Sequence, residues 1–134
     1  MKQNIDLEAR VIQRFVNKDK QERYLGFISS PKNRWKFINE LPHFKDFKWN
    51  LLEAISKDEE NTILAAMKSY NLHQNSCYVI SFDPKIDTKE MDVSDAIGEV
   101  ANYNMGTILV FGDAKMIVYG GEEIKSTYIS KYID

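Results

Sequence analysis

The sequence predicts an α+β fold in which N-terminal helices pack on a small mixed sheet. Through the first half of the chain, apolar residues recur at helical spacing. Two short apolar runs follow, CYVISF at 77–82 and TILVF at 107–111, and such runs are typical of strands covered on both faces. After the second run, a Gly-Asp-Ala step leads into KMIVYGG at 115–121, which indicates a hairpin.

The first helix is predicted from the near-3.6-residue spacing of its apolar side chains. Asp6 and Glu8 stand at its front, where acidic side chains stabilise a helix N-terminus. The polar run NKDKQE at 17–22 either ends this helix or forms its solvated middle, and YLGFIS at 24–29 is apolar again. The apolar positions of the first helix are Ile5, Val11, Ile12, Phe15 and Val16.

The next stretch, SSPKNRWKFINEL at 29–41, reads as the start of another helix. Ser30 is a good N-cap, and Pro31 suits the first helical position because its missing N–H is not needed there. Trp35, Ile38 and Leu41 recur at helical spacing, so we expect all three in the core. The proline that follows Leu41 ends this helix.

Residues 43–55 and 63–70 carry two further apolar stripes at helical spacing. The charged run SKDEEN at 56–61 lies between them, and its acidic residues favour the N-terminus of the second helix. LHQNS at 72–76 reads as a linker into the β-rich part of the chain.

A helix at 92–103, capped by Asp92, is predicted between the two apolar runs. Strand, helix and strand in this order predict a right-handed βαβ crossover with parallel strands at 77–82 and 107–111. With the hairpin they form a mixed β-α-β-β sheet, which the N-terminal helices cover as a single pair of layers. Residues 122–134 fit either a docked terminal helix or an edge strand.

The length and composition of the chain predict one domain over 1–134, with a helical part at 1–72 and an α/β part at 73–134. The chain has 134 residues, of which 43% are apolar and 28% charged, both ordinary for a globular domain. The single cysteine, Cys77, excludes an internal disulfide and suits a reducing compartment. No stretch approaches the roughly 18 apolar residues of a membrane span. We therefore expect a cytoplasmic protein that does not contact a membrane.

Three segments of the chain resemble a family of small bacterial proteins. These segments are SSPKNRWKF, CYVISFDPKIDTKEM and MGTILVFG, and they occur in the same order along most of the chain. The resemblance covers a Ser-Pro-Lys helix start, a Cys-Tyr-Val-Ile-Ser strand followed by an acidic loop, and a Gly-Thr strand that enters a hairpin. No activity comes with this resemblance, so it implies no catalytic residue. It supports the prediction that the chain forms one domain.

Positive charge is concentrated near the N-terminus. Residues 1–50 hold eleven Lys and Arg against six Asp and Glu, a balance of +5, while the rest holds seven against fourteen, a balance of −7. This split favours an anion-binding face, although two oppositely charged halves also attract each other within one fold. The pI of about 5.7 argues against a dedicated nucleic-acid binder.

The candidate anion-binding residues lie on the predicted N-terminal helices. Free N–H groups and the helix dipole bind anions at a helix start, where cationic side chains add charge-assisted bonds. The alternative is that these side chains form ordinary solvated helix faces. The candidates are Ser30, Lys32 and Arg34 at the predicted helix start, with Arg10 and Arg14 on the first helix.

An acidic loop at 83–91 is the candidate metal site. Asp83 directly follows a predicted strand, and open α/β sheets place ligands at strand ends. Asp83, Asp87 and Glu90 offer the carboxylate oxygens that Mg²⁺ or Mn²⁺ prefers. The alternative is that these residues have the turn roles common for aspartate, since their spacing matches no calcium loop.

Other motifs give little indication of catalysis. Cys77 and His73 stand four apart, but a thiol that opens a buried strand is best interpreted as an inert core residue. Phosphate-loop, dinucleotide, nucleophile-elbow and zinc-protease motifs are all missing from the sequence. Gly120 and Gly121 read as a strand exit, although paired glycines also admit a ligand close to the backbone.

The sequence therefore favours a non-catalytic interaction or binding module that needs no cofactor. Its expected partner is another protein or a second copy of the chain, because its charged faces have opposite signs. One alternative is a metal-assisted enzyme that uses Mg²⁺ or Mn²⁺ on a phosphate-bearing substrate. Another is nucleic-acid binding through the basic N-terminal helices.

Overall fold

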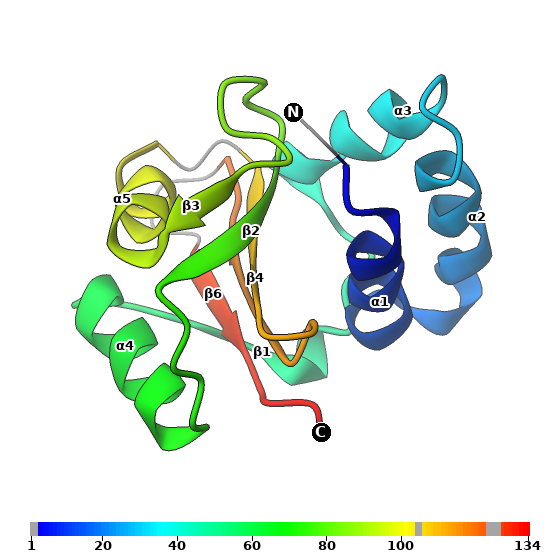
Figure 1. The fold of residues 1–134 in the computed structure, drawn as a ribbon. Helices are drawn as coiled ribbons and strands as arrows, with labels where there is room; N and C mark the ends of the chain where they lie inside the picture. Colours follow the sequence, from blue (N-terminus) through cyan, green and yellow to red (C-terminus); the bar gives the residue numbers. More distant parts are fainter. Residues whose placement is uncertain (1–2, 104–105, 123–126) are drawn as a thin grey trace.

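An antiparallel sheet forms the centre of the molecule in the computed structural model, which describes residues 3–103, 106–122 and 127–134 (Figure 1). Within these residues the sheet has six strands in the order β1-β6-β5-β4-β2-β3. The strands are β1 (Leu52–Ala54), β2 (Ser76–Ser81), β3 (Glu90–Asp92), β4 (Thr107–Phe111), β5 (Met116–Gly120) and β6 (Thr127–Ser130).

Helices cover both faces of this sheet, as Figure 1 shows. One layer holds α1 (Ile5–Phe15), α2 (Lys18–Ile28) and α3 (Arg34–Ile38), and the other holds α4 (Glu59–Ser69) and α5 (Val93–Tyr103). Alternate strand residues point to opposite layers, so Tyr78 and Ile80 pack with the first while Cys77 and Val79 pack with the second. The α+β class is confirmed, but the sheet has a helical layer on each face rather than on one.

The predicted parallel crossover is wrong, because β2 and β4 run antiparallel with Val79 opposite Leu109. The chain leaves β2, turns back through β3 along one edge of the sheet, and only then enters α5. An apolar run shows that a strand is covered on both faces but carries no information on its direction. With helices on both faces, antiparallel strands lose the polar alternation that would have distinguished them.

The C-terminal segment is a strand inside the sheet. β6 pairs with β5 on one side and with β1 on the other, so it is neither the docked helix nor the edge strand that the sequence left open. Residue pairs Glu53–Ile129 and Val118–Ile129 fix its register. The edge on this side of the sheet is β1, a three-residue strand from the segment predicted as a helix at 43–55.

Residues 41–51, called the strap below, connect α3 to β1 and are not one helix. They contain the 3₁₀ turns η1 (Leu41–His43) and η2 (Trp49–Leu51) around an extended stretch. Phe44 and Phe47 are buried in the core between the sheet and the layer of α1, α2 and α3, called the first core below. Phe47 also forms an isolated antiparallel bridge with Val16. The apolar spacing that suggests a helix here arises because an extended chain buries two aromatic rings separately.

The helix predicted to start at Ser30 begins later, and this changes which side chains are buried. Backbone N–H groups of Asn33 and Arg34 bond to the Ser30 carbonyl at 2.9 and 3.0 Å, so residues 30–33 form a turn before α3. This short helix turns Phe37 rather than Trp35 toward the sheet, so Phe37 is buried while Trp35 is 56% exposed. The prediction that Trp35 lies in the core is therefore wrong, whereas Leu41 is buried as expected.

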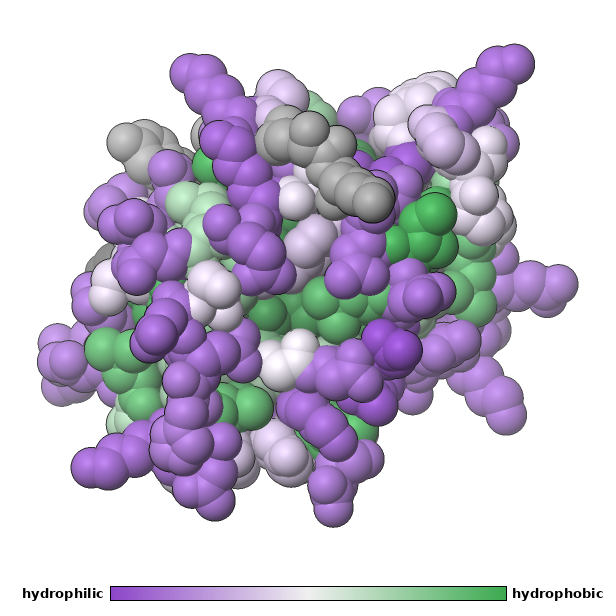
Figure 2. Space-filling view, viewed as in Figure 1, coloured by the Kyte–Doolittle hydropathy of each residue, from purple (hydrophilic) through white to green (hydrophobic). Residues whose placement is uncertain are grey.

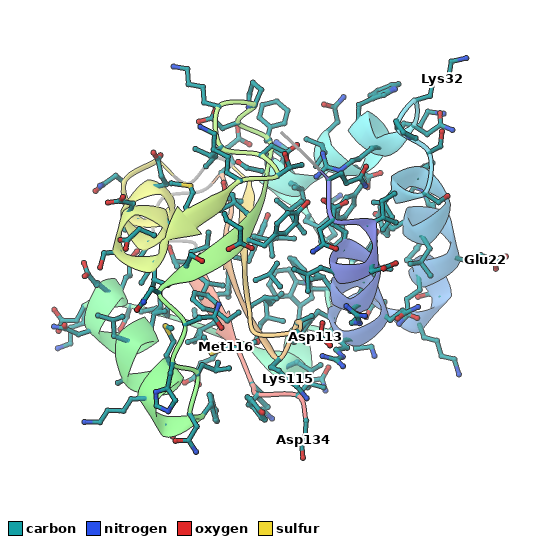
Figure 3. All side chains as sticks on the ribbon, viewed as in Figure 1. Glu22, Lys32, Asp113, Lys115, Met116 and Asp134 are labelled. Carbon is teal, nitrogen blue, oxygen red and sulfur yellow. The ribbon has the colours of Figure 1, made fainter. Side chains whose placement is uncertain are left out.

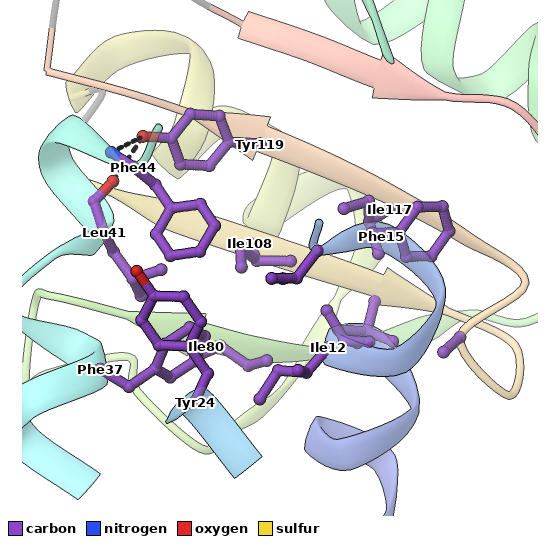
Figure 4. Close-up of a cluster of buried hydrophobic side chains, with 14 of the residues drawn as sticks. Ile12, Phe15, Tyr24, Phe37, Leu41, Phe44, Ile80, Ile108, Ile117 and Tyr119 are labelled. Carbon is purple, nitrogen blue, oxygen red and sulfur yellow. Dashed lines mark hydrogen bonds between the residues drawn. The ribbon is translucent and has the colours of Figure 1, made fainter. Parts of the chain in front are cut away.

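The first core is rich in aromatic rings (Figure 4). Tyr24, from α2, packs against Phe37 and Phe44 with ring centroids 5.5 and 5.2 Å apart. Its hydroxyl lies 2.8 Å from a Glu40 oxygen and 2.5 Å from an Asp46 oxygen. Burial and these two carboxylates raise the pKa of the Tyr24 phenol far above its usual range. Tyr24 therefore links α2 to Glu40, just before the strap, and to Asp46 within the strap.

Tyr24→Phe is expected to lower the free energy of unfolding by about 1–2 kcal/mol, because it removes the phenol that the carboxylates of Glu40 and Asp46 contact. Urea denaturation at neutral pH measures this loss. Tyr70→Phe is the matched control, since the Tyr70 ring is 36% exposed, and it should change stability little. Equal effects of the two substitutions would contradict the role assigned to the Tyr24 hydroxyl.

Candidate functional site

A cleft opens where the strap crosses the ends of β5 and β6. It has a volume of about 350 Å³, at the small end of the range for ligand pockets. The residues that line this cleft come from the strap and from the ends of β5 and β6. They are Pro42, His43, Phe44, Lys45, Trp49, Tyr119, Gly121, Glu122 and Tyr128.

Hydrogen bonds to the sheet hold the first half of the strap in place. The Tyr119 hydroxyl donates to the Leu41 carbonyl and accepts from the Phe44 N–H at 3.2 Å, as the dashed lines in Figure 4 show. The Glu122 N–H donates to the Pro42 carbonyl at 3.0 Å. One buried tyrosine and one main-chain bond thus fix this wall of the cleft against β5.

The second half of the strap is fixed to the helical layer. The Lys48 N–H donates to the Phe15 carbonyl at 2.7 Å, and the Asn17 N–H donates to the Asp46 carbonyl at the same distance. These bonds join the strap to the last residue of α1 and to the turn that follows it. With both halves held by main-chain bonds, the cleft is formed before any ligand arrives, which reduces the entropic cost of binding.

Aromatic rings form one wall of the cleft. The Trp49 and Tyr128 rings meet edge to face with centroids 5.1 Å apart, and Tyr128 stacks beside Tyr119 at 6.3 Å. Phe47 supports both Trp49 and Tyr119 from the core side. Trp49 is nevertheless 39% exposed, and its Nε1–H donates to the Lys45 carbonyl at 2.9 Å. The indole is thus held in position with part of its apolar surface open.

The charges of the cleft leave one cation without a counter-ion. His43 Nε2 and Glu122 Oε2 lie 2.6 Å apart, and both side chains are mostly exposed. The exposed Lys45 ammonium makes no ion pair with any residue that the structure describes.

Arg34, predicted to bind an anion, is instead satisfied inside the protein. Its guanidinium contacts Glu8 at 3.0 and 2.7 Å and Asp87 at 2.5 and 3.0 Å. Tyr78 donates its hydroxyl to Glu8 at 2.7 Å, and these four residues form what we call the Arg34 network. Burial alone would lower the pKa of Arg34, but the hydrogen bonds that the guanidinium donates to the carboxylates of Asp87 and Glu8 outweigh it and raise the pKa. The network joins α1, α3, β2 and the acidic loop.

The remaining candidate cations lie in two separate places. Arg10 pairs with Asp113 at 2.7 Å, and Arg14 donates to the Asp113 and Ala114 carbonyls at 2.5 and 3.0 Å. Both therefore hold the β4–β5 turn against α1. Lys32 points away from the molecule at the far end of the helical layer, well separated from Asp113 (Figure 3). Ser30 lies in the turn before α3 rather than at a cap, and an anion-binding role for these residues stays a prediction.

The three predicted metal ligands each have a different partner. Asp83 accepts from the Lys85 N–H at 3.0 Å, Glu90 accepts from the Ser76 hydroxyl at 3.0 Å, and Asp87 belongs to the Arg34 network. Among the residues in 3–103, 106–122 and 127–134, no three metal-ligating side chains gather as an ion would require. The structure thus brings Arg34 and Asp87 together, one from each predicted site, but as an ion pair whose charges neutralise each other.

Cys77 is a buried core residue. Burial, with smaller contributions from Glu90 and Asp92, raises the pKa of its thiol to about 12. At neutral pH the thiol stays protonated, and the protonated form is a poor nucleophile. This agrees with the interpretation of Cys77 as an inert thiol.

Sequence reasoning missed the cleft, although it noted one of its residues. The pair Gly120–Gly121 reads in the sequence as a strand exit that also admits a close ligand, and Gly121 does line the cleft. His43, Lys45 and Trp49 give no signal in the sequence, because the apolar spacing at 43–55 predicts a helix there. Trp49 follows two buried phenylalanines in an extended chain, and only the fold shows that its ring stays partly exposed.

Figure 2 shows one face of the molecule, where hydrophilic residues cover most of the helices and apolar residues appear in a band between α1 and the opposite layer. Within the described part of the chain, no helix is long and apolar enough to cross a bilayer.

Comparison of the chain with protein-family models, with curated proteins and with solved structures found no match, so the resemblance to a bacterial family stays a prediction.

Proposed function

We propose that this protein is a non-catalytic binding module whose ligand occupies the cleft. The observation that carries the proposal is the aromatic wall of Trp49 and Tyr128, held open by a strap that is hydrogen-bonded on both sides. Concave, apolar, pre-formed sites with a few polar groups are the usual form of small-molecule sites.

The dimensions of the cleft favour a compact ligand with a flat ring. A volume of about 350 Å³ accommodates one small molecule. Exposed indole and phenol rings bind flat rings by stacking or edge contact, worth about 0.5–1.5 kcal/mol beyond the buried area. A second hollow of about 340 Å³ runs along β1 and includes Ala54, Lys57 and Ile129, but none of the described residues that line it is aromatic.

The catalytic alternative has less support. The carboxylates proposed for a metal-assisted reaction point to separate partners, and Arg34, proposed to clamp a phosphate, is bonded to Glu8 and Asp87. Partner proteins, self-association and a cytoplasmic location stay predictions of the sequence, as does the single domain over residues 1–134.

The proposal is tested by nuclear magnetic resonance of ¹⁵N-labelled protein. The chain has two tryptophans, and Trp35→Phe identifies the indole N–H signal of Trp49 by elimination. Unlabelled indole, indole-3-acetate and adenosine are titrated in turn. At least one is expected to shift the Trp49 signal saturably, because a ring bound in the cleft contacts the indole.

Trp35 provides the internal control for these titrations. It is more exposed than Trp49 but lies on α3, outside the cleft, so its signal should stay in place when the Trp49 signal moves. Parallel, unsaturable shifts of both signals would indicate non-specific contact with exposed rings. That result, or no shift with any ring, would overturn the proposed function.

A further inference from the structure

We propose that the cleft selects ligands whose flat ring carries an anionic group, and that Lys45 binds this group. The inference rests on the proposed function, since it concerns the ligand of the same cleft. It assigns Lys45 the role of a specificity-determining residue. The two other ionisable side chains on the polar side of the cleft, His43 and Glu122, contact each other at 2.6 Å.

Lys45 and the aromatic wall are held in a fixed relation. The Lys45 carbonyl accepts the indole N–H of Trp49 at 2.9 Å, which joins the main chain of Lys45 to the ring. The neighbouring residue Phe44 is bonded through its N–H to Tyr119. The main chain is thus fixed on both sides, and the Lys45 side chain lines the same cleft as the rings of Trp49 and Tyr128.

The electrostatics favour an anion over a cation. Aromatic sites with an acidic residue can also bind ligand cations, and Glu122 is such an acid. However, Glu122 already contacts His43 at 2.6 Å, whereas Lys45 makes no ion pair with the described residues. A cationic ligand would have to displace His43 and face the Lys45 charge. An anionic ligand gains a charge-assisted bond and displaces no protein contact.

The cleft supplies a further donor for the same group. Tyr128 lines the cleft, and its hydroxyl is not hydrogen-bonded to the described residues, so it is available to a ligand oxygen. An ammonium and a phenol are suited to the oxygens of a carboxylate or a phosphate alike. The shared chemistry is thus a planar ring with an oxyanion, which aromatic carboxylates and nucleotides both provide.

Matched ligand pairs test the inference and separate the two sources. Indole-3-acetate is compared with neutral indole-3-acetamide, and adenosine monophosphate with adenosine, each by titration of the Trp49 indole signal. In at least one pair the anion should bind about tenfold or more tightly, the scale of a hydrogen bond between charged groups. The pair that shows the difference identifies the carboxylate or the phosphate as the preferred anion.

Variants of two lysines on the strap show whether the selectivity belongs to Lys45. Lys45→Met should abolish the anion preference, and Lys45→Arg should retain it. Lys48→Met removes the same charge from the same strap but outside the cleft lining, so it should leave the preference unchanged. Equal losses in Lys45→Met and Lys48→Met would overturn the inference, because a diffuse positive field would then explain the preference.

The outcomes separate this inference from the proposed function. If neutral and anionic rings bind equally at Trp49, the cleft is a binding site without charge selection, and only the inference is overturned. If no ring of either charge shifts the Trp49 signal, both are overturned.

Discussion

Arg34→Met is expected to lower the free energy of unfolding by about 3–5 kcal/mol, the cost of leaving buried charges without a partner. Glu8 is fully buried, and the guanidinium supplies two of the hydrogen bonds to its carboxylate. Asp87 loses two bonds from the same group. Methionine fills part of the space but donates nothing. Urea denaturation at pH 7 measures the loss.

Arg10→Met is the control for this experiment. Arg10 also makes an ion pair at 2.7 Å, but its side chain and that of Asp113 are 41% and 57% exposed. Exposed pairs contribute about 1 kcal/mol or less, so the control should be nearly neutral. If Arg34→Met destabilises the protein no more than Arg10→Met does, the Arg34 network is not the structural link between α1, α3 and the acidic loop.

Gly106→Ala is expected to cost about 3 kcal/mol, because the backbone there has no room for a side chain. Gly106 has a φ of +70°, which costs an L-residue about 1–2 kcal/mol. A Cβ would lie 2.4 Å from the Pro42 nitrogen and 2.8 Å from the Leu41 carbonyl carbon, and overpacking adds about 1–3 kcal/mol. The atoms in the way are main chain, so the strap itself must move.

Gly26→Ala is the matched control and should act in the opposite direction. Gly26 lies inside α2, and a Cβ there would meet no atom within 4 Å. Alanine is favoured over glycine in a helix by about 0.5–1 kcal/mol, so this variant should be more stable than the original protein. Thermal unfolding compares the two. A stable Gly106→Ala protein with an unchanged Trp49 indole signal would contradict the close packing of the strap on Gly106.

The sequence predicts where many elements lie but not how they are arranged. α5 and strands β2, β4 and β5 fall where the apolar runs, the Asp92 cap and the hairpin step place them. These are local signals, written in neighbouring residues. The direction of β2 relative to β4 depends on a distant partner, and an apolar run is compatible with both directions. The same limit applies to β6, whose neighbours β1 and β5 lie in different parts of the chain.

At the candidate site, local sequence patterns predict even less, because its contacts join residues that are far apart in the chain. Spacing predicts that Trp35 is buried, but α3 spans only Arg34–Ile38 and buries Phe37 instead. Arg34 and Asp87 stand far apart in the sequence, so no local pattern indicates that they neutralise each other. The cleft is formed by the strap and by the ends of β5 and β6, and its existence depends on the packing of three separate segments.

The most direct test of the binding cleft is the position of a bound ring, measured by intermolecular nuclear Overhauser effects. The ligand is whichever ring shifts the Trp49 signal in the titrations. Its protons should show contacts to the side chains of Trp49 and Tyr128, which line the cleft, and none to Trp35 on α3. Contacts confined to Trp35 or to residues outside the cleft would contradict the account.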